Sequence, residues 1–207
     1  MAPRSAEQSD FDRTHGVETE GDFAGCTYLS DLDITSPNWI EGHNYVPIER
    51  DRFDRILNAL DIPFEEYTFV DLGSGMGRAL LLASEYPFKR IIGLEFSPQL
   101  HGRAEENIRR YRSPNQRCKA IQSRNEDLAC FSPPPGPLVL YLFDPCQARI
   151  LNSLLPKIGQ SLIADPRPLF LVYVAFRPEH EEMFASAGYL KQISKNAELD
   201  YLIYQSQ

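Results

Sequence analysis

The segment VDLGSGMGR, Val70 to Arg78, constrains the fold of this chain more than any other part of the sequence. An apolar run leads into Gly73, Gly75 and Gly77, and a helical pattern follows directly. Glycine permits a tight backbone turn and leaves room for a ligand to approach the main chain. The segment therefore predicts a strand, a ligand-binding turn and a helix, in that order.

Strand and helix patterns alternate beyond Tyr45. A helix is expected over 48–60, and further helices are expected to begin at Arg78, Pro98, Gln147 and Pro178. The spacing predicts strands at Tyr67–Leu72, Arg90–Leu94, Lys119–Gln122, Leu138–Phe143, Leu169–Phe176, Tyr189–Ile193 and Leu199–Tyr204. The last two are too close for a crossover helix, so they should pair antiparallel. The predicted class is α/β: five βα repeats, a mostly parallel seven-stranded sheet with a C-terminal antiparallel hairpin, and helices on both faces.

The negative charge is concentrated at the N-terminus. Residues 1–46 carry nine acidic side chains and two arginines, a net charge of −7 out of −8 for the chain. We expect residues 1–44 to form an acidic extension, partly disordered or folded as a lid, and residues 45–207 to form the ligand-binding domain. An acidic chain repels phosphate backbones, so a nucleic acid is an unlikely partner, whereas a basic acceptor would be attracted.

The composition also bears on location and metals. No apolar run approaches the roughly 20 residues that cross a bilayer, and the first residues lack the apolar stretch of a secretory signal. A cytoplasmic protein without a membrane partner is expected. The four cysteines are far apart and have no histidine at ligand spacing, so we expect reduced thiols and no metal site.

The details of the glycine loop bear on the ligand. A dinucleotide fingerprint requires a glycine three positions after Gly77, where this chain has Leu80. Asp71, just before the loop, would repel a pyrophosphate but can accept hydrogen bonds from an ammonium group. Glu95 ends the second strand, where a carboxylate can accept both ribose hydroxyls, and Phe96 is placed to pack on an adenine. S-adenosylmethionine has the ammonium and the nucleoside and no phosphate.

VDLGSGMGR followed by IIGLEFSPQL resembles the first two motifs of class I S-adenosylmethionine-dependent methyltransferases, over residues from about 45 to the end. NYVPIERDRFDRIL and GLEFSPQLHGRAEENI are similar to the subgroup of the histone-lysine methyltransferase DOT1-like and related bacterial proteins. The resemblance implies a Rossmann-like methyltransferase fold and S-adenosylmethionine as cofactor, held by the loop with Ser74. It also implies that Tyr45 covers the cofactor.

Two further positions follow from the resemblance. An acid after the third strand would cap the adenine amino group, and Asp127 is favoured over Glu126 because Phe131 follows it by four residues. The alternative is that both acids only cap a short helix. The fourth strand ends in YLFDPC, similar to the Asn/Asp-Pro motif of amino-group methyltransferases. It implies catalytic roles for Asp144, Pro145 and Tyr141, although Cys146 stands where the fullest motif has a second proline.

The expected function is methyl transfer to an amine, either of a protein lysine or of a small molecule. Asp144, through its side chain or its backbone carbonyl, would hold the acceptor, since positioning supplies much of the rate. SPNWIEGHNY, Ser36 to Tyr45, is a candidate lid, although Trp39 could equally pack against the sheet edge. The alternatives are an aminopropyl transferase, a nicotinamide oxidoreductase and a non-catalytic relative that binds a partner. The acceptor and the oligomeric state are not specified by the sequence.

Overall fold

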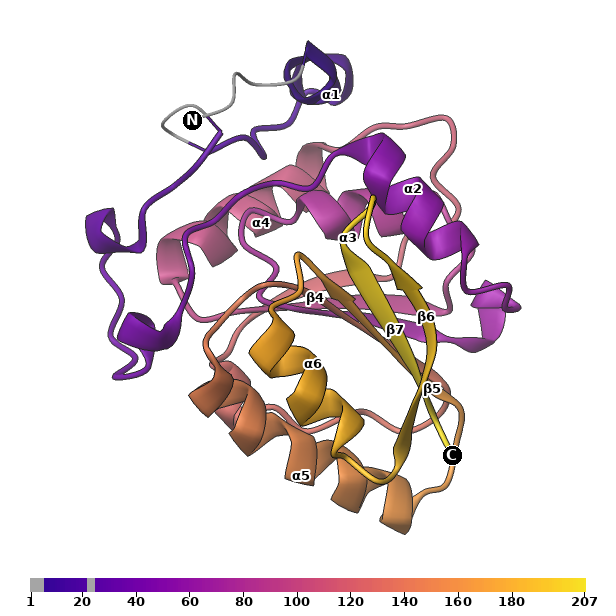
Figure 1. The fold of residues 1–207 in the computed structure, drawn as a ribbon. Helices are drawn as coiled ribbons and strands as arrows, with labels where there is room; N and C mark the ends of the chain where they lie inside the picture. The colour runs from indigo at the N-terminus through magenta and orange to yellow at the C-terminus, as the bar shows by residue number, and fades with distance from the viewer. Residues whose placement is uncertain (1–5, 22–24) are drawn as a thin grey trace.

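The computed structural model describes residues 6–21 and 25–207, in which one seven-stranded sheet runs through the molecule (Figure 1). The strand order is β3-β2-β1-β4-β5-β7-β6. Strands β1 to β5 pair in parallel, whereas β7 is antiparallel to both β5 and β6. The predicted fold class is confirmed. The strand bounds are β1 (Thr68–Leu72), β2 (Arg90–Glu95), β3 (Ile121–Asn125), β4 (Leu138–Phe143), β5 (Leu169–Val174), β6 (Leu190–Asn196) and β7 (Tyr201–Ser206).

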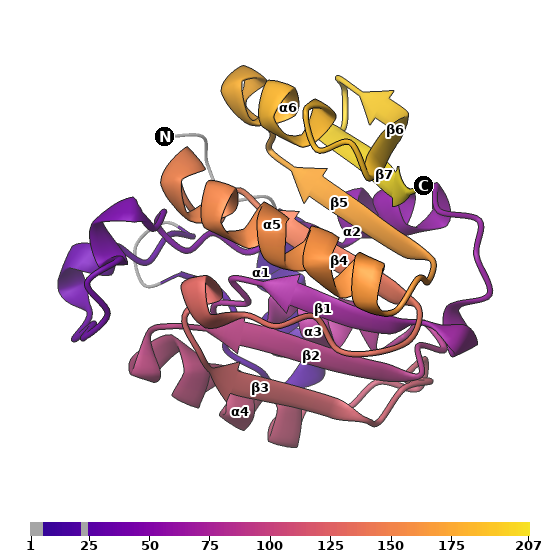
Figure 2. The same ribbon diagram turned by 90° about the horizontal axis from the view of Figure 1, so that it is seen from below.

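Helices cover both faces of the sheet, because the central strands are apolar on both sides. Figure 2 shows α2, α3 and α4 on one face and α5 and α6 on the other. Phe69 of β1 joins the core under α2 and α3, and its neighbour Val70 joins the core under α5. The bounds are α1 (Ala6–His15), α2 (Arg50–Asn58), α3 (Arg78–Ala83), α4 (Pro98–Arg110), α5 (Ala148–Ala164) and α6 (Pro178–Ala185).

Several predicted elements differ from the structure, including the last two strands, which lie at Leu190–Asn196 and Tyr201–Ser206. The repeat after β3 has only the 3-10 helix η4 (Leu128–Cys130), so the prediction of five βα repeats is wrong by one; the proline-rich stretch 132–137 lacks the amide donors that a helix needs. The third strand begins at Ile121 and continues through polar residues, which an edge strand tolerates. The fifth strand ends two residues early because Ala175 takes a positive φ of 54°.

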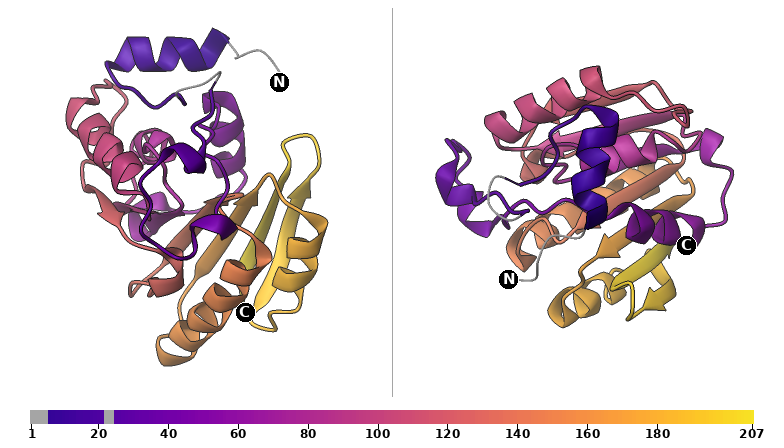
Figure 3. Two further views of the ribbon diagram at one scale, coloured as in Figure 1. Left: turned by 90° about the vertical axis from the view of Figure 1, so that its left-hand side faces the viewer. Right: turned by 90° about the horizontal axis from the view of Figure 1, so that it is seen from above.

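The N-terminal segment begins with α1, a helix that the sequence did not predict. Phe11 is buried beside Tyr111 at the end of α4, and the Arg78 guanidinium lies 4.1 Å from the Phe11 ring centroid. Asn107 of α4 donates to the Glu18 carbonyl at 2.9 Å and accepts from the Glu18 amide at 2.8 Å. Figure 3 shows α1 lying across the layer of α2, α3 and α4. The part of the predicted extension at 1–5 and 22–24 lies outside the described residues.

The topology creates one reversal of strand order. From β1 the chain proceeds to β2 on one side, and β4 pairs with the other side of β1. Parallel α/β sheets form a crevice outside the carboxyl ends of their strands at such a point, because the connecting segments diverge. Among the described residues, no helix is long and apolar enough to cross a bilayer.

Candidate functional site

A cavity lies at this reversal, outside the carboxyl ends of β1, β2 and β4. It encloses about 850 Å³ of space free of protein atoms, counted out to its open mouth. All but one of the residues predicted from sequence line it. The predicted residues that line the cavity are Tyr45, Asp71, Gly73, Ser74, Gly75, Glu95, Phe96, Asp127, Tyr141, Asp144 and Pro145. The structure therefore brings together side chains that are distant in the sequence.

The glycine loop forms one wall of the cavity. Gly75 has a φ of +52°, and a Cβ atom built there would lie 2.0 Å from the ring of Tyr45. Tyr45 therefore packs directly on the loop, with its hydroxyl donating to the Thr19 carbonyl at 2.6 Å. Gly77 is the exception among the predicted residues. Its Cβ position faces Ala104, so this glycine permits α3 to approach α4 and does not line the cavity.

Asp71 lies at the floor of the cavity. It is buried, and burial together with the charge of Glu95 raises the pKa of its carboxyl to about 8. Tyr141 is its neighbour across the β1–β4 pair, and the Tyr141 hydroxyl is buried without a hydrogen-bond partner in the described structure. Ser74 Oγ and Arg78 Nη1 are unpartnered in the same way, and both residues line the cavity. Buried polar atoms of this kind are costly unless a ligand satisfies them.

Glu95 connects the loop to the turn after β2. Its two carboxylate oxygens accept hydrogen bonds from the Gly75 amide at 2.9 Å and the Ser97 amide at 2.8 Å. Burial raises the pKa of Glu95 to about 7, against the opposing effect of these amides. The Phe96 amide also donates to this carboxylate, which has about four acceptor sites and so retains capacity for a further donor.

Because Asp71 and Glu95 are protonated more readily when folded, the protein without ligand should lose stability as the pH rises. Their unfolded pKa values are about 4. Their contribution is therefore fully present below pH about 4 and is lost as the pH rises through about 7 and 8. We expect a lower urea midpoint at pH 8.5 than at pH 5.5.

The Asp71→Asn variant should show a smaller decrease between these two pH values, because its amide does not titrate. Asp51→Asn, on the exposed surface of α2, is the matched control and should follow the wild type. An unchanged decrease in Asp71→Asn would contradict the assigned cause.

Asp127 is engaged at both carboxylate oxygens. Oδ1 accepts from the Ala129 amide at 2.8 Å and so caps η4, as the alternative from sequence proposed. Oδ2 accepts from the hydroxyl of Ser36 and from the side-chain amide of Asn38. Burial alone would raise the pKa of Asp127, but these hydrogen bonds lower it. Its carboxylate therefore joins β3 to the segment that crosses the cavity mouth.

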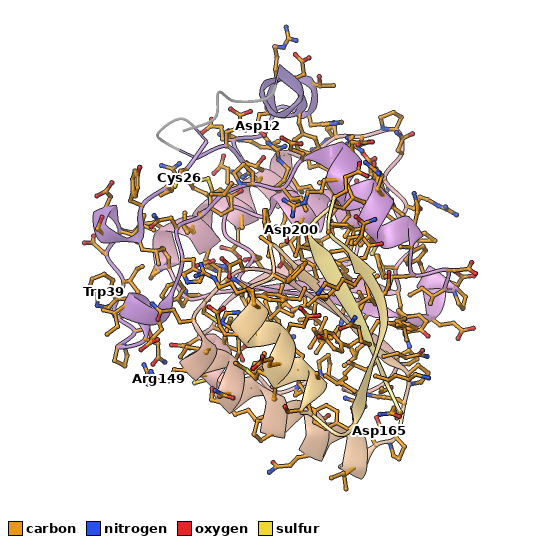
Figure 4. All side chains as sticks on the ribbon, viewed as in Figure 1. Asp12, Cys26, Trp39, Arg149, Asp165 and Asp200 are labelled. Atoms are coloured by element: carbon orange, nitrogen blue, oxygen red, sulfur yellow. The ribbon has the colours of Figure 1, made fainter. Side chains whose placement is uncertain are left out.

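We call residues 25–47 the cover segment. It contains the 3-10 helices η1 (Leu29–Asp31) and η2 (Trp39–Glu41) and forms short antiparallel bridges that join Thr27 to Tyr45 and Gly42 to Cys146. Arg149 of α5 donates to Glu41 at 2.8 Å. Trp39 does not line the cavity: it projects from the edge of the molecule in Figure 4 and is 44% exposed.

Asp144 is held by several polar contacts. Its φ of 39° places it in the left-handed region, and its carboxylate accepts from Arg177 Nη2 at 2.9 Å and from the Tyr173 hydroxyl at 3.1 Å. His43 Nδ1 lies 2.8 Å from the Asp144 carbonyl oxygen and 3.2 Å from Oδ2. Against the effect of burial, these partners hold the pKa of Asp144 well below its usual range. The carboxylate and the carbonyl oxygen, the two groups predicted to hold an acceptor amine, therefore already have partners in the structure.

Pro145 and Tyr141 also have structural contacts. Pro145 packs against Gly73, where an added Cβ would lie 2.6 Å from the proline Cβ, and its carbonyl accepts from the His43 amide at 3.1 Å. Tyr141 points into the core beside Phe53, with ring centroids 5.6 Å apart. Its hydroxyl is at the cavity floor near Asp71.

Sequence reasoning missed two charged residues of the cavity. Arg78 is 1% exposed and is held by Asp12 and Thr19 of the N-terminal segment. Arginine is rarely buried, so its type gave no indication of this site. The available sequence signal was its position directly after the glycine loop. His43 lies inside the candidate lid segment, and nothing in its sequence neighbourhood pointed to Asp144, 101 residues away.

The cysteines form no metal site in the part of the chain that the structure describes. All four are free, and no group of three or more histidine, cysteine, aspartate or glutamate side chains is arranged to hold a metal ion there. Cys146 is buried in the cavity wall, and burial raises the pKa of its thiol to about 12. It is therefore a neutral packing group at physiological pH.

Comparison by sequence finds no matching family model and no matching curated protein. Comparison of structures finds methyltransferases. The methyltransferase domain of a bacterial Hen1, CtHen1-CN, aligns over 76% of this chain and 98% of its own, with a TM-score of 0.54 and 17% identity. A SAM-dependent methyltransferase from Leishmania major aligns over 76% of this chain and 71% of its own, with a TM-score of 0.54 and 11% identity.

A third structure was solved with its cofactor. Magnesium protoporphyrin IX methyltransferase from Synechocystis PCC 6803, with bound SAM, aligns over 76% of this chain and 79% of its own, with a TM-score of 0.51 and 14% identity. At such low identity these matches establish a shared Rossmann-like methyltransferase fold. They give no support to the DOT1-like subgroup.

Proposed function

We propose that this chain binds S-adenosylmethionine in the cavity and transfers its methyl group to an acceptor. The observation that carries the proposal is the buried polar set at the cavity floor: the Asp71 carboxyl together with the unpartnered atoms Ser74 Oγ, Tyr141 OH and Arg78 Nη1. Such a set suits a ligand that carries both an ammonium and a carboxylate, since each unpartnered atom would gain a charged or polar partner.

The lining residues fit the parts of this cofactor. Asp71 would accept from its ammonium, and Arg78 would donate to its carboxylate. Glu95 would accept from the ribose hydroxyls at its remaining lone pairs, and Phe96 and Leu128 supply apolar surface for the adenine. When bound, the cofactor supplies a methyl group on a positively charged sulfur.

A nicotinamide dinucleotide fits the same residues poorly. Asp71 lies directly before the glycine loop, where a dinucleotide places its pyrophosphate, and it is buried and acidic. Bringing a pyrophosphate next to this carboxyl would require it to remain protonated, because like charges at close range repel strongly. We therefore do not propose an oxidoreductase.

The acceptor is proposed more coarsely than the cofactor. The sequence suggested an amine of a protein lysine or a small molecule, held by Asp144. The ion pair of Asp144 with Arg177 removes the free acceptor that an amine would need there. In this proposal Asp144 is a positioning residue, and an amine remains one of the acceptor classes to be assayed.

Calorimetric titration of the purified full chain tests the cofactor assignment. Asp71→Asn should bind S-adenosylmethionine about 10- to 100-fold more weakly than the wild type, since a charge-assisted hydrogen bond contributes about 1.5–3 kcal/mol. Asp51→Asn is again the control and should bind as the wild type does. NAD should not bind to any of the three proteins.

The outcomes also separate the alternatives. Failure of the wild type to bind S-adenosylmethionine or S-adenosylhomocysteine would overturn the proposal and favour a relative that uses the fold only to bind a partner. Binding of decarboxylated S-adenosylmethionine in preference to the intact cofactor would favour an aminopropyl transferase. The Arg78 guanidinium, which would pair with the carboxylate, predicts the opposite preference.

A further inference from the structure

Polar contacts of the backbone and of Nδ1 hold the ring of His43 at the cavity wall. Its backbone amide donates to Pro145 O, and the adjacent Gly42 forms the bridge to Cys146. Nδ1 lies within hydrogen-bond distance of the Asp144 carbonyl, at 2.8 Å, and of the Asp144 carboxylate, at 3.2 Å. The ring is therefore anchored through Nδ1 and through the backbone on either side.

Asp144 is itself fixed by partners other than His43. Arg177 Nε and Nη2 reach the carboxylate at 3.0 and 2.9 Å, and the Tyr173 hydroxyl donates to Oδ1 at 3.1 Å. Tyr173 is in turn 2.5 Å from Nδ1 of the buried His180. A carboxylate held by this many donors keeps its orientation, so it can hold the histidine in one orientation as well.

These contacts determine where the proton of neutral His43 resides. The carbonyl oxygen and the ionised carboxylate of Asp144 are both acceptors, so Nδ1 must be the donor. Nε2 then carries the lone pair. His43 lines the cavity, and no described residue forms a hydrogen bond or ion pair with Nε2. A basic nitrogen is thus available at the wall of the proposed cofactor cavity.

We propose that His43, positioned by Asp144, is the general base of the reaction, and that the methyl acceptor is a hydroxyl group. The inference rests on the proposed function. As the acceptor oxygen forms its bond to the methyl carbon, the carbon–sulfur bond breaks with its electron pair retained by sulfur, and the hydroxyl proton passes to His43 Nε2. The proton leaves His43 for solvent after product release.

The polar groups at the cavity wall favour a hydroxyl acceptor over an amine. A neutral amine already has a free lone pair, so it can attack without first losing a proton. A hydroxyl oxygen is a weak nucleophile until its proton is removed, which requires a base of this kind. Nε2 of neutral His43 can accept a hydrogen bond from either group, but only the hydroxyl requires the proton removal that a base supplies.

The charges around His43 support its role. The hydrogen bond to Asp144 raises the pKa of His43, whereas burial and the charge of Arg177 lower it. Tyr173 contacts Asp144, and His180 contacts Tyr173. The base form is present only above this raised pKa, so turnover should fall as the pH decreases through it. Asp144→Asn should move this acid limb to lower pH, because the substitution removes the main cause of the shift.

A measurement on the free protein tests the assignment without any acceptor. Long-range ¹⁵N–¹H correlation spectra of the imidazole rings report which nitrogen carries the proton, with His43→Gln used to assign the signal. We expect neutral His43 to be the Nδ1–H tautomer in the wild type and a mixture in Asp144→Asn. A neutral Nε2–H tautomer in the wild type would overturn the proposal and leave the proposed cofactor binding untouched.

The second arm measures transfer of tritium from methyl-labelled S-adenosylmethionine to probe acceptors: catechol, a simple phenol, an aliphatic alcohol, a primary amine and a lysine peptide. We expect methylation of a hydroxyl probe, with kcat reduced about 100- to 10,000-fold in His43→Gln. The affinity for S-adenosylmethionine, measured by calorimetry, should change little.

His101→Gln is the matched control, because His101 of α4 is also hydrogen-bonded, to Ser123, and lies outside the cavity lining. It should retain full turnover. A protein that binds the cofactor but methylates only the amine probes, or none of the hydroxyl probes, would overturn the hydroxyl assignment. A protein that does not bind the cofactor would instead overturn the proposed function.

Discussion

Gly75→Ala should abolish measurable binding of S-adenosylmethionine and lower the free energy of unfolding by about 2–5 kcal/mol. The added Cβ would lie 2.0 and 2.2 Å from two ring carbons of Tyr45, far inside van der Waals contact. Alanine would also have to adopt a φ of +52°, which L-residues other than asparagine and aspartate rarely do. Either the ring or the loop must move, and both line the cavity.

A double-mutant cycle separates the two causes. Tyr45→Ala removes the ring, so Gly75→Ala should cost less in that background, with the remainder due to the backbone. Gly102→Ala is the control: no atom lies within 4 Å of its Cβ position and it sits inside α4, so this change should be neutral or stabilising by up to about 1 kcal/mol. Urea unfolding measures all four variants. An equal cost of Gly75→Ala in both backgrounds would contradict the packing of Tyr45 on the loop.

Arg78→Met should release the N-terminal segment from the domain and lower the free energy of unfolding by about 3 kcal/mol. The guanidinium donates to Thr19 and Asp12 and lies 4.1 Å from the centroid of the Phe11 ring. Methionine replaces the apolar stem of arginine as far as Nε but has no guanidinium, so the polar partners are left unsatisfied. Loss of a desolvated cation over an aromatic ring adds to the cost.

Two measurements check this expectation. Urea unfolding gives the free energy, and brief trypsin treatment should cleave at Arg13 much faster in the variant than in the wild type. Arg109→Met is the control, because Arg109 is largely exposed on α4 and pairs only with Glu106, a contact worth less than about 1 kcal/mol. If Arg78→Met and Arg109→Met were equally stable and equally resistant to trypsin, Arg78 would not anchor the segment.

The two expectations are connected through Tyr45. Its ring lies on Gly75 and its hydroxyl donates to the carbonyl of Thr19, the residue whose side chain accepts from Arg78. Docking of the N-terminal segment therefore positions the residue that packs on the glycine loop. The composition predicted that the acidic N-terminus is an extension or a lid. The part of it that the structure describes contacts the cavity wall.

Much of the fold could be predicted from the sequence because the signals are local. The apolar run before Gly73, the glycines themselves and the acid ending the second strand occur within a short stretch of chain. The backbone conformation or the position that each of them requires depends only on residues nearby in the sequence. The alternation of strands and helices is local in the same sense, and it predicted the seven-stranded sheet together with its C-terminal hairpin. One error arose at the sheet edge, where β3 is polar and half exposed.

The candidate site was predictable in its position and only partly in its chemistry. Asp71 and Glu95 could be identified because each ends a strand, and parallel strands end at the same edge of the sheet. The partners of Asp144 could not be predicted, because they depend on what the fold places around its carboxylate. Arg177 and His43, which occupy it, come from a later turn and from the N-terminal segment.

The sequence by itself determined the order of elements, the glycine loop and the acids beside it, because backbone conformation and strand ends depend on nearby residues. Only the tertiary structure decided which side chains are paired and which are free. Packing buried Arg78 with one unpartnered nitrogen, engaged Asp144 with three side chains and left Nε2 of His43 at the cavity wall. Charge pairing depends on distances between segments far apart in the chain, and those distances exist only after folding.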